Sequence, residues 1–262
     1  MIRKPSIGSF FAVAIKEIRV SMRYPVNFIA QFISLFVFAG LFGSVWAMFG
    51  GDESFIEIAL SGLIVMELLA DSLWGIGFSM SWERYQGTLE SFYLTPVNRF
   101  TSAVARFGVT FIWMPITMIM CFGILGAIGA EVHILAGLGV LFFIFPMLTG
   151  IGCAFAGICL LFKQTGQVLI GFVQFGAMLF CAFFYPFFSL PEPMLWISRF
   201  IPLSYGIDAF RAVLLGTPPE LLGLRAEMIL LAIFAVISPL LGYLIYSVAE
   251  HRVLVEGGLR VY

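Results

Sequence analysis

Two acidic residues interrupt a strongly apolar run, and they are the first candidates for chemistry in this sequence. Glu67 and Asp71 lie four residues apart, which places them on one face of a helix. An ionised acid at the centre of a bilayer costs about 2.5–3.5 kcal/mol on insertion scales, so both side chains are expected to face protein or water. Two interpretations stay open: a proton relay or cation site, or hydrogen bonding between helices that serves structure alone.

The segment from Ser81 to Phe100 is a second concentration of polar residues, with two arginines and two glutamates. Its apolar positions recur at spacings of three and four: Trp82, Tyr85, Leu89 and Phe92. This spacing predicts a short helix that presses an aromatic face on the membrane or on neighbouring spans, and a solvated connector is the alternative. The other face is expected to show its charges to the cytosol: Glu83, Arg84 and Glu90. The helix should stop near Thr95, because the residue before a proline avoids helical angles.

A third candidate region joins the last two apolar runs, between Tyr185 and Arg225. Prolines break it into pieces that are apolar but too short to span a bilayer: Pro186, Pro191, Pro193 and Pro202. Residues 185–215 are therefore expected to form a hairpin of half-helices that re-enters the membrane, with an apolar surface loop as the alternative. Within this hairpin, Asp208 and Arg211 are three residues apart and are expected to pair with each other.

The composition sets the environment that these residues share. The chain has 262 residues, of which 61% are hydrophobic and 11% are charged, and its mean hydropathy is +1.05. These values exclude an ordinary soluble domain and favour membrane-spanning helices over a barrel. The four cysteines lie in apolar runs without a C-x-x-C pair, so we expect packing roles for them and neither disulfides nor a metal site. No nucleic-acid partner is expected.

Six spans can be read from the apolar runs, and no soluble domain is predicted between them. They cover Asn27–Phe49, Ile58–Met80, Thr101–Ile128, Ile134–Phe162, Gly166–Phe188 and Ala226–Val248. Residues 1–25 precede the first span and have the spacing of an amphipathic helix in the headgroup region, with a positively charged cytosolic tail as the alternative. With the N-terminus in the cytosol, eleven Lys and Arg residues lie inside and three outside, which satisfies the positive-inside rule. Both termini and residues 81–98 are then cytosolic.

Two motifs in these regions resemble those of a known family. The first is E-x3-G-T-L-E-x4-T-P, which begins at Glu83 and ends at Pro96. The second is P-L-S-Y-G-I-D-A-F-R, which runs from Pro202 to Arg211. Both are similar to motifs in the permeases of the ABC type-2 exporter family. The resemblance covers essentially the whole chain, so residues 1–262 are expected to form a single transmembrane domain.

The resemblance implies an all-α integral membrane fold and a half-transporter. Two copies of this permease, or two related permeases, would join two cytosolic ATP-binding subunits in the prokaryotic plasma (inner) membrane. Residues 81–98 would form the coupling helix that docks on the ATPase, and its candidate residues are Glu83, Arg84, Gly87, Thr88 and Glu90. The hairpin before the sixth span would flank the transport path, and its candidate residues are Pro186, Pro191, Pro202, Asp208 and Arg211.

The sequence does not contain the motifs of an ATPase or of a common hydrolase. Because it has no G-x4-G-K-[ST] and no Gly-Lys pair, ATP and Mg²⁺ are expected to bind the partner subunit and not this chain. H-E-x-x-H and G-x-S-x-G are also missing, so no enzymatic activity is expected. The expected function is export of a hydrophobic or amphiphilic substrate, such as a drug, a lipid or a lipid-linked glycan. Membrane lipids are expected to surround the protein. The alternative is a proton- or ion-coupled secondary transporter that uses Glu67 and Asp71.

Overall fold

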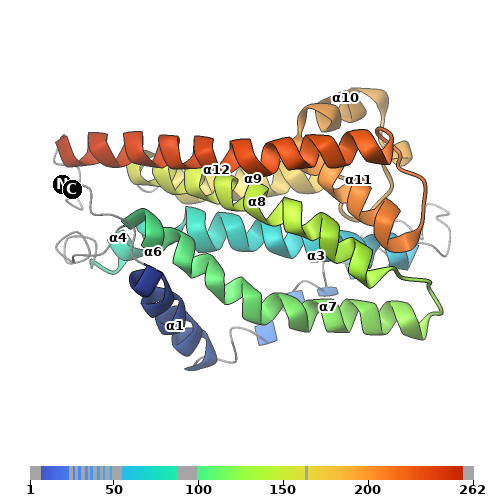
Figure 1. Ribbon diagram of the computed structural model, residues 1–262, viewed down its shortest axis with the longest axis horizontal. Coiled ribbons are helices and arrows are strands. Elements are labelled where there is room, and N and C mark those ends of the chain that lie inside the picture. The colour runs from blue at the N-terminus through green and yellow to red at the C-terminus, as the bar shows by residue number, and fades with distance from the viewer. Residues whose placement is uncertain are drawn as a thin grey trace.

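The computed structural model describes residues 7–23, 55–87, 99–162 and 165–255, together with scattered positions between 24 and 54. In these parts of the chain every regular element is a helix and no strand occurs. Most of the helices run along the long axis of an elongated bundle (Figure 1). Much of the predicted first span, Asn27–Phe49, and residues 88–98 lie outside the described residues.

Two long helices form the spine of the bundle and lie side by side (Figure 1). They are α8, Ile134–Phe162, and α12, Leu224–Val255, and both are long and apolar enough to cross a membrane. The helix predicted at 134–162 has these bounds, whereas the last helix extends beyond the predicted 226–248. Close packing between the two depends on glycine, because Gly150 lies against the backbone at Ser238 and also against Gly242. The Ser238 hydroxyl adds a hydrogen bond of 2.7 Å to the Met147 carbonyl.

This contact gives a prediction about stability. In Gly150→Ala the new methyl group would overlap the Ser238 carbonyl and the Pro239 nitrogen, so α8 and α12 must separate. Overpacking of this kind costs about 1–3 kcal/mol. Gly139→Ala is the matched control, because Gly139 lies on the same helix and has no neighbouring atom within 4 Å. Thermal unfolding in detergent should show a lower midpoint for Gly150→Ala alone, and equal midpoints for the two variants would refute the contact.

A second helical path contains a π-helical segment. It consists of α3, Phe55–Ala70, then η1, Asp71–Gly77, and then α4, Ser79–Tyr85, so the predicted second span ends later than Met80. The Ser72 hydroxyl in η1 donates to the Leu148 carbonyl of α8 at 2.5 Å. Gly152 of α8 lies against the same serine, where a Cβ atom would have no space. These contacts fix the π-helical segment to the spine.

The remaining bundle helices are shorter. α6, Arg99–Arg106, continues through the 3₁₀ turn η2, Phe107–Val109, into α7, Thr110–Ala127. α1, Ile7–Arg23, packs on α6 and η2, where its Ala14 is buried.

α9, Thr165–Phe180, ends eight residues before the predicted Phe188, and that prediction is wrong. The helix stops because residues 181–185 turn, with Ala182 in the left-handed region at φ 51°.

The proline-rich region forms short helices, as predicted from its prolines. These are η3, Phe187–Ser189, α10, Glu192–Phe200, and α11, Pro202–Leu215. Pro191 precedes α10, and Pro202 starts α11 directly after the extended residue Ile201. α10 and α11 lie beside the first part of α12, at the opposite end of the bundle from α1, α4 and α6 (Figure 1).

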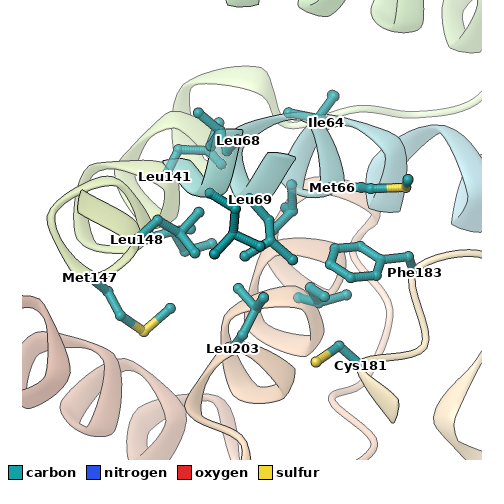
Figure 2. Close-up of a cluster of buried hydrophobic side chains, with 14 of the residues drawn as sticks. Ile64, Met66, Leu68, Leu69, Leu141, Met147, Leu148, Cys181, Phe183 and Leu203 are labelled. Atoms are coloured by element: carbon teal, nitrogen blue, oxygen red, sulfur yellow. The ribbon is translucent and has the colours of Figure 1, made fainter. Parts of the chain in front are cut away.

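The apolar core joins the helices that carry the candidate residues. Figure 2 shows Leu69 of α3, Leu148 of α8 and Leu203 of α11 converging on one cluster, with Phe183 from the turn after α9 at its edge. All four of these side chains are at most 3% exposed. The core therefore links the middle of the bundle to the α10–α11 end.

Candidate functional site

Polar side chains gather in two clusters at opposite ends of the bundle. The first is the α4–α6 cluster, which we define as Glu83, Arg84 and Arg106. Glu83 of α4 and Arg106 of α6 form an ion pair, and each side chain is only 11% exposed. This pair connects the two helices between which residues 86–98 run. The pair therefore joins α4 to α6 directly.

Arg84 connects the same cluster to the spine. Its guanidinium donates to the Leu160 carbonyl of α8 at 2.9 Å, and the residue is 9% exposed. Leu160 lies in the last turn of α8, where carbonyl groups have no partner within the helix. A cation is favoured at this end of a helix by the helix dipole. The α4–α6 cluster thus joins three helices: α4, α6 and α8.

The orientation predicted for these charges is wrong. Glu83 and Arg84 point into the protein, whereas Trp82 and Tyr85 are 50% and 51% exposed. The cause is the position of α4 beside α6 and α8, because both neighbours supply groups that compensate a buried charge. Gly87, with φ 70°, lies in the turn that ends α4. Thr88 and Glu90 lie outside the described residues.

The second group is the α11–α12 cluster, which we define as Asp208, Arg211, Glu220 and Glu227. The backbone carbonyls in the turn after α9 are not paired with N–H groups of a continuing helix, and the Arg211 side chain supplies hydrogen-bond donors for them. Its guanidinium donates to four backbone carbonyls and one hydroxyl: Ala182 at 2.6 Å, Phe183 at 2.6 Å, Tyr185 at 3.1 Å, Ile58 at 3.3 Å and Ser61 Oγ at 3.4 Å. Irregular backbone inside an apolar bundle needs such partners. Arg211 therefore ties α11 to α3 and to the turn.

The acids of this cluster bind backbone amides of the loop between α11 and α12. Asp208 Oδ2 accepts the N–H groups of Glu220 at 2.8 Å and Leu221 at 2.6 Å. Glu227 Oε1 accepts the N–H of Leu222 at 3.0 Å. The predicted direct ion pair between Asp208 and Arg211 does not form, because each binds backbone groups, although their charges still interact.

Glu220 connects the loop to the start of the hairpin. Its Oε2 accepts the Phe188 N–H at 2.8 Å. Burial raises the pKa of the Glu220 carboxyl above its ordinary value, although the Phe188 N–H acts in the opposite direction. Among the hairpin prolines, Pro186 is buried at the turn before η3, and Pro191 is exposed.

The acid pair of the second span lies between the two clusters. Glu67 is 2% exposed and hydrogen-bonds with Thr117 of α7, and Asp71 opens the π-helical segment η1 and is half-buried. Within the described parts of the chain, no group of three or more His, Cys, Asp or Glu side chains is arranged to hold a metal ion. The contact with Thr117 is the interhelical hydrogen bond that the structural interpretation requires.

Three residues of the two clusters were not predicted from the sequence: Arg106, Glu220 and Glu227. Two of them carry a signal that was available. Arg106 and Glu227 are ionisable residues inside predicted spans, and such residues are rare unless they have a partner or a function. Glu220 lies in a link and carries no such signal.

Comparison with known families adds an independent observation. Residues 8–215 match the family model described as ABC-2 type transporter. The match includes the whole α4–α6 cluster and two members of the α11–α12 cluster, Asp208 and Arg211. Glu220 and Glu227 lie beyond it. No curated protein matched the sequence.

Proposed function

Because the chain belongs to the ABC-2 type transporter family, we propose that it is the permease subunit of an ATP-driven exporter. As a member, it is an integral membrane protein and a transport subunit, and it is not itself the ATPase. The ATP-binding partner would carry ATP and Mg²⁺. Two such partners and a second permease, identical or related, would complete the transporter.

The proposed topology has six spans, with the α4–α6 end of the bundle in the cytosol and the α10–α11 end outside. Support comes from charge, because α1 carries Lys16, Arg19 and Arg23, and α12 ends near Arg252 at the same end of the bundle (Figure 1). The membrane would be the prokaryotic plasma (inner) membrane, with both termini cytosolic. Residues 185–215 would re-enter from the outer side.

α1 fits the proposed headgroup helix. Its Ala14 packs on the bundle, while Phe11 and Met22 are 58% and 66% exposed. Exposed apolar side chains next to lysine and arginine are typical of helices that lie in the membrane interface. Membrane lipids would cover this face of α1.

The observation that carries the proposed mechanism is the buried Glu83–Arg106 ion pair. Residues 81–98 would contain the coupling helix, and the pair connects the helices at both ends of the segment. A push by the ATPase on this segment would therefore move α4 and α6 together, and Arg84 would pass the movement to α8. ATP shifts the transporter between inward-open and outward-open states only through its different affinity for them.

The substrate class follows the sequence-based expectation: a hydrophobic or amphiphilic molecule such as a drug, a lipid or a lipid-linked glycan. Glu67 would then be a structural residue that binds Thr117, and a proton- or ion-coupled carrier that uses Glu67 and Asp71 remains the alternative. The two functions differ in their energy source. Replacement of Glu67 by Gln should abolish transport only in the alternative.

Purification of the tagged chain from its own membrane tests the proposal. In mild detergent we expect an ATP-binding subunit to co-purify, with an ATP hydrolysis rate that falls when Glu83 or Glu90 is replaced by Lys. Glu131→Lys is the control, because Glu131 is exposed in the link before α8, at the opposite end of the bundle. A chain that purifies alone and transports in response to an ion gradient without ATP would refute the proposal.

A further inference from the structure

Two carboxyl groups meet where α11 contacts the first turn of α12. Glu227 is 0% exposed and Asp208 is 3% exposed, and their side chains are within hydrogen-bonding reach of each other. Glu227 Oε1 accepts the Leu222 N–H. Its Oε2 is buried and receives no hydrogen bond from any donor in the described parts of the chain. The group next to it is another carboxyl, which can donate only when it carries a proton.

The surrounding charges do not compensate two ionised carboxylates. Arg211 interacts electrostatically with Asp208, but its guanidinium donates to backbone carbonyls and to Ser61. Glu220 adds a third carboxyl on the loop, and the Tyr205 hydroxyl interacts with Glu227. His133, from the link before α8, is exposed, and its imidazole lies near Gly216, directly after α11.

We propose that Asp208 and Glu227 hold one proton between them and that this proton joins α11 to α12. Two adjacent buried carboxyl groups do not both ionise readily, because each negative charge disfavours the other. A shared proton gives Glu227 Oε2 the partner that it otherwise lacks. No group of three or more His, Cys, Asp or Glu side chains in the described residues is arranged to hold a metal ion here, and the sodium dependence measured below distinguishes a cation from a proton.

The proton also determines the order of the loop between the two helices. Three consecutive amides, those of residues 220, 221 and 222, donate to this same pair of acids. Loss of the proton would leave two carboxylates that repel each other, so the loop would separate from α11 or from α12. This proton-binding site goes beyond the proposed export function and does not depend on it.

Infrared spectroscopy of the purified protein tests the shared proton directly. The C=O stretch of a buried protonated carboxyl should be weaker in both Glu227→Gln and Asp208→Asn than in the wild type, whereas Glu67, a second carboxyl that is only 2% exposed, is the same in all three proteins. Glu220→Gln is the matched control, because Glu220 belongs to the same cluster but accepts the Phe188 N–H. This control should keep the absorption.

Hydrogen exchange at residues 216–223 provides the second measurement. After correction for the intrinsic effect of pH, protection of these amides should fall with rising pH in the wild type. It should stay high and independent of pH in Glu227→Gln, whose amide group donates to Asp208 permanently. A C=O absorption that is as strong in both Glu227→Gln and Asp208→Asn as in the wild type would overturn the proposal. So would loop protection that follows the sodium concentration and not pH, because a cation would then bridge the acids.

Discussion

Replacing Arg211 by Met should cause the largest loss of stability of any single substitution considered for this protein. Methionine has a similar length but no donors, so the carbonyls of residues 182, 183 and 185 lose the partner that they have in the turn. Hydrogen bonds to a charged group contribute about 1.5–3 kcal/mol each, and unsatisfied buried carbonyls add a further cost. We expect a loss of at least about 3 kcal/mol, because several such bonds disappear together.

The measurement is thermal unfolding of the purified chain in detergent. Arg211→Lys should fall between wild type and Arg211→Met, because one ammonium has three donors and cannot reach all five acceptors. The control is Arg199→Met, since Arg199 is exposed and its guanidinium carbon lies 5.5 Å from the centre of the Trp196 ring. A cation–π contact at an exposed site contributes only about 0.5–1 kcal/mol. Equal midpoints for Arg211→Met and Arg199→Met would contradict the role given to Arg211.

Helices were predictable where one continuous apolar run decides the structure. The bounds of α8 followed from its run of apolar residues, and Pro146 inside it did not end the helix. The end of α9 was not predictable in the same way, because residues 181–185 are as apolar as the helix before them. The chain turns there because Arg211, about thirty residues later, supplies the donors. A local pattern contains no information about such a distant partner.

The orientation of the charges in α4 shows a second limit of pattern reading. The spacing of the apolar residues predicted an aromatic face that contacts the membrane or neighbouring spans, and it therefore placed Glu83 and Arg84 on the opposite face, toward the cytosol. In a membrane protein an apolar face can also contact lipid, and buried charges then need partners within the bundle. Trp82 and Tyr85 are exposed, and Glu83 meets Arg106 inside. The sequence identified Glu83 and Arg84 as candidate functional residues. Their partners, Arg106 and the Leu160 carbonyl, are known only from the structure.

Breaking the Glu83–Arg106 pair should have the second large effect. Glu83→Arg or Arg106→Glu leaves two like charges at a site where each side chain is 11% exposed. Removing one partner of a buried pair typically costs about 3–5 kcal/mol, and partial solvent access here favours the lower end. The double variant Glu83→Arg, Arg106→Glu restores opposite charges and should recover most of the loss. Thermal unfolding of both single variants and the double variant measures this, and a double variant less stable than either single one would exclude a direct pair.

The same three variants test the mechanical role of the pair when the ATPase is present. Hydrogen exchange at residues 216–223, at the far end of the bundle, can be compared with and without ATP and vanadate, and no transport substrate is required. We predict that ATP and vanadate change the hydrogen exchange of residues 216–223 in the wild type and in the charge-swapped double variant. Neither single variant should show this change. A change of wild-type size in Glu83→Arg and in Arg106→Glu would show that the ATPase acts on the bundle without this pair.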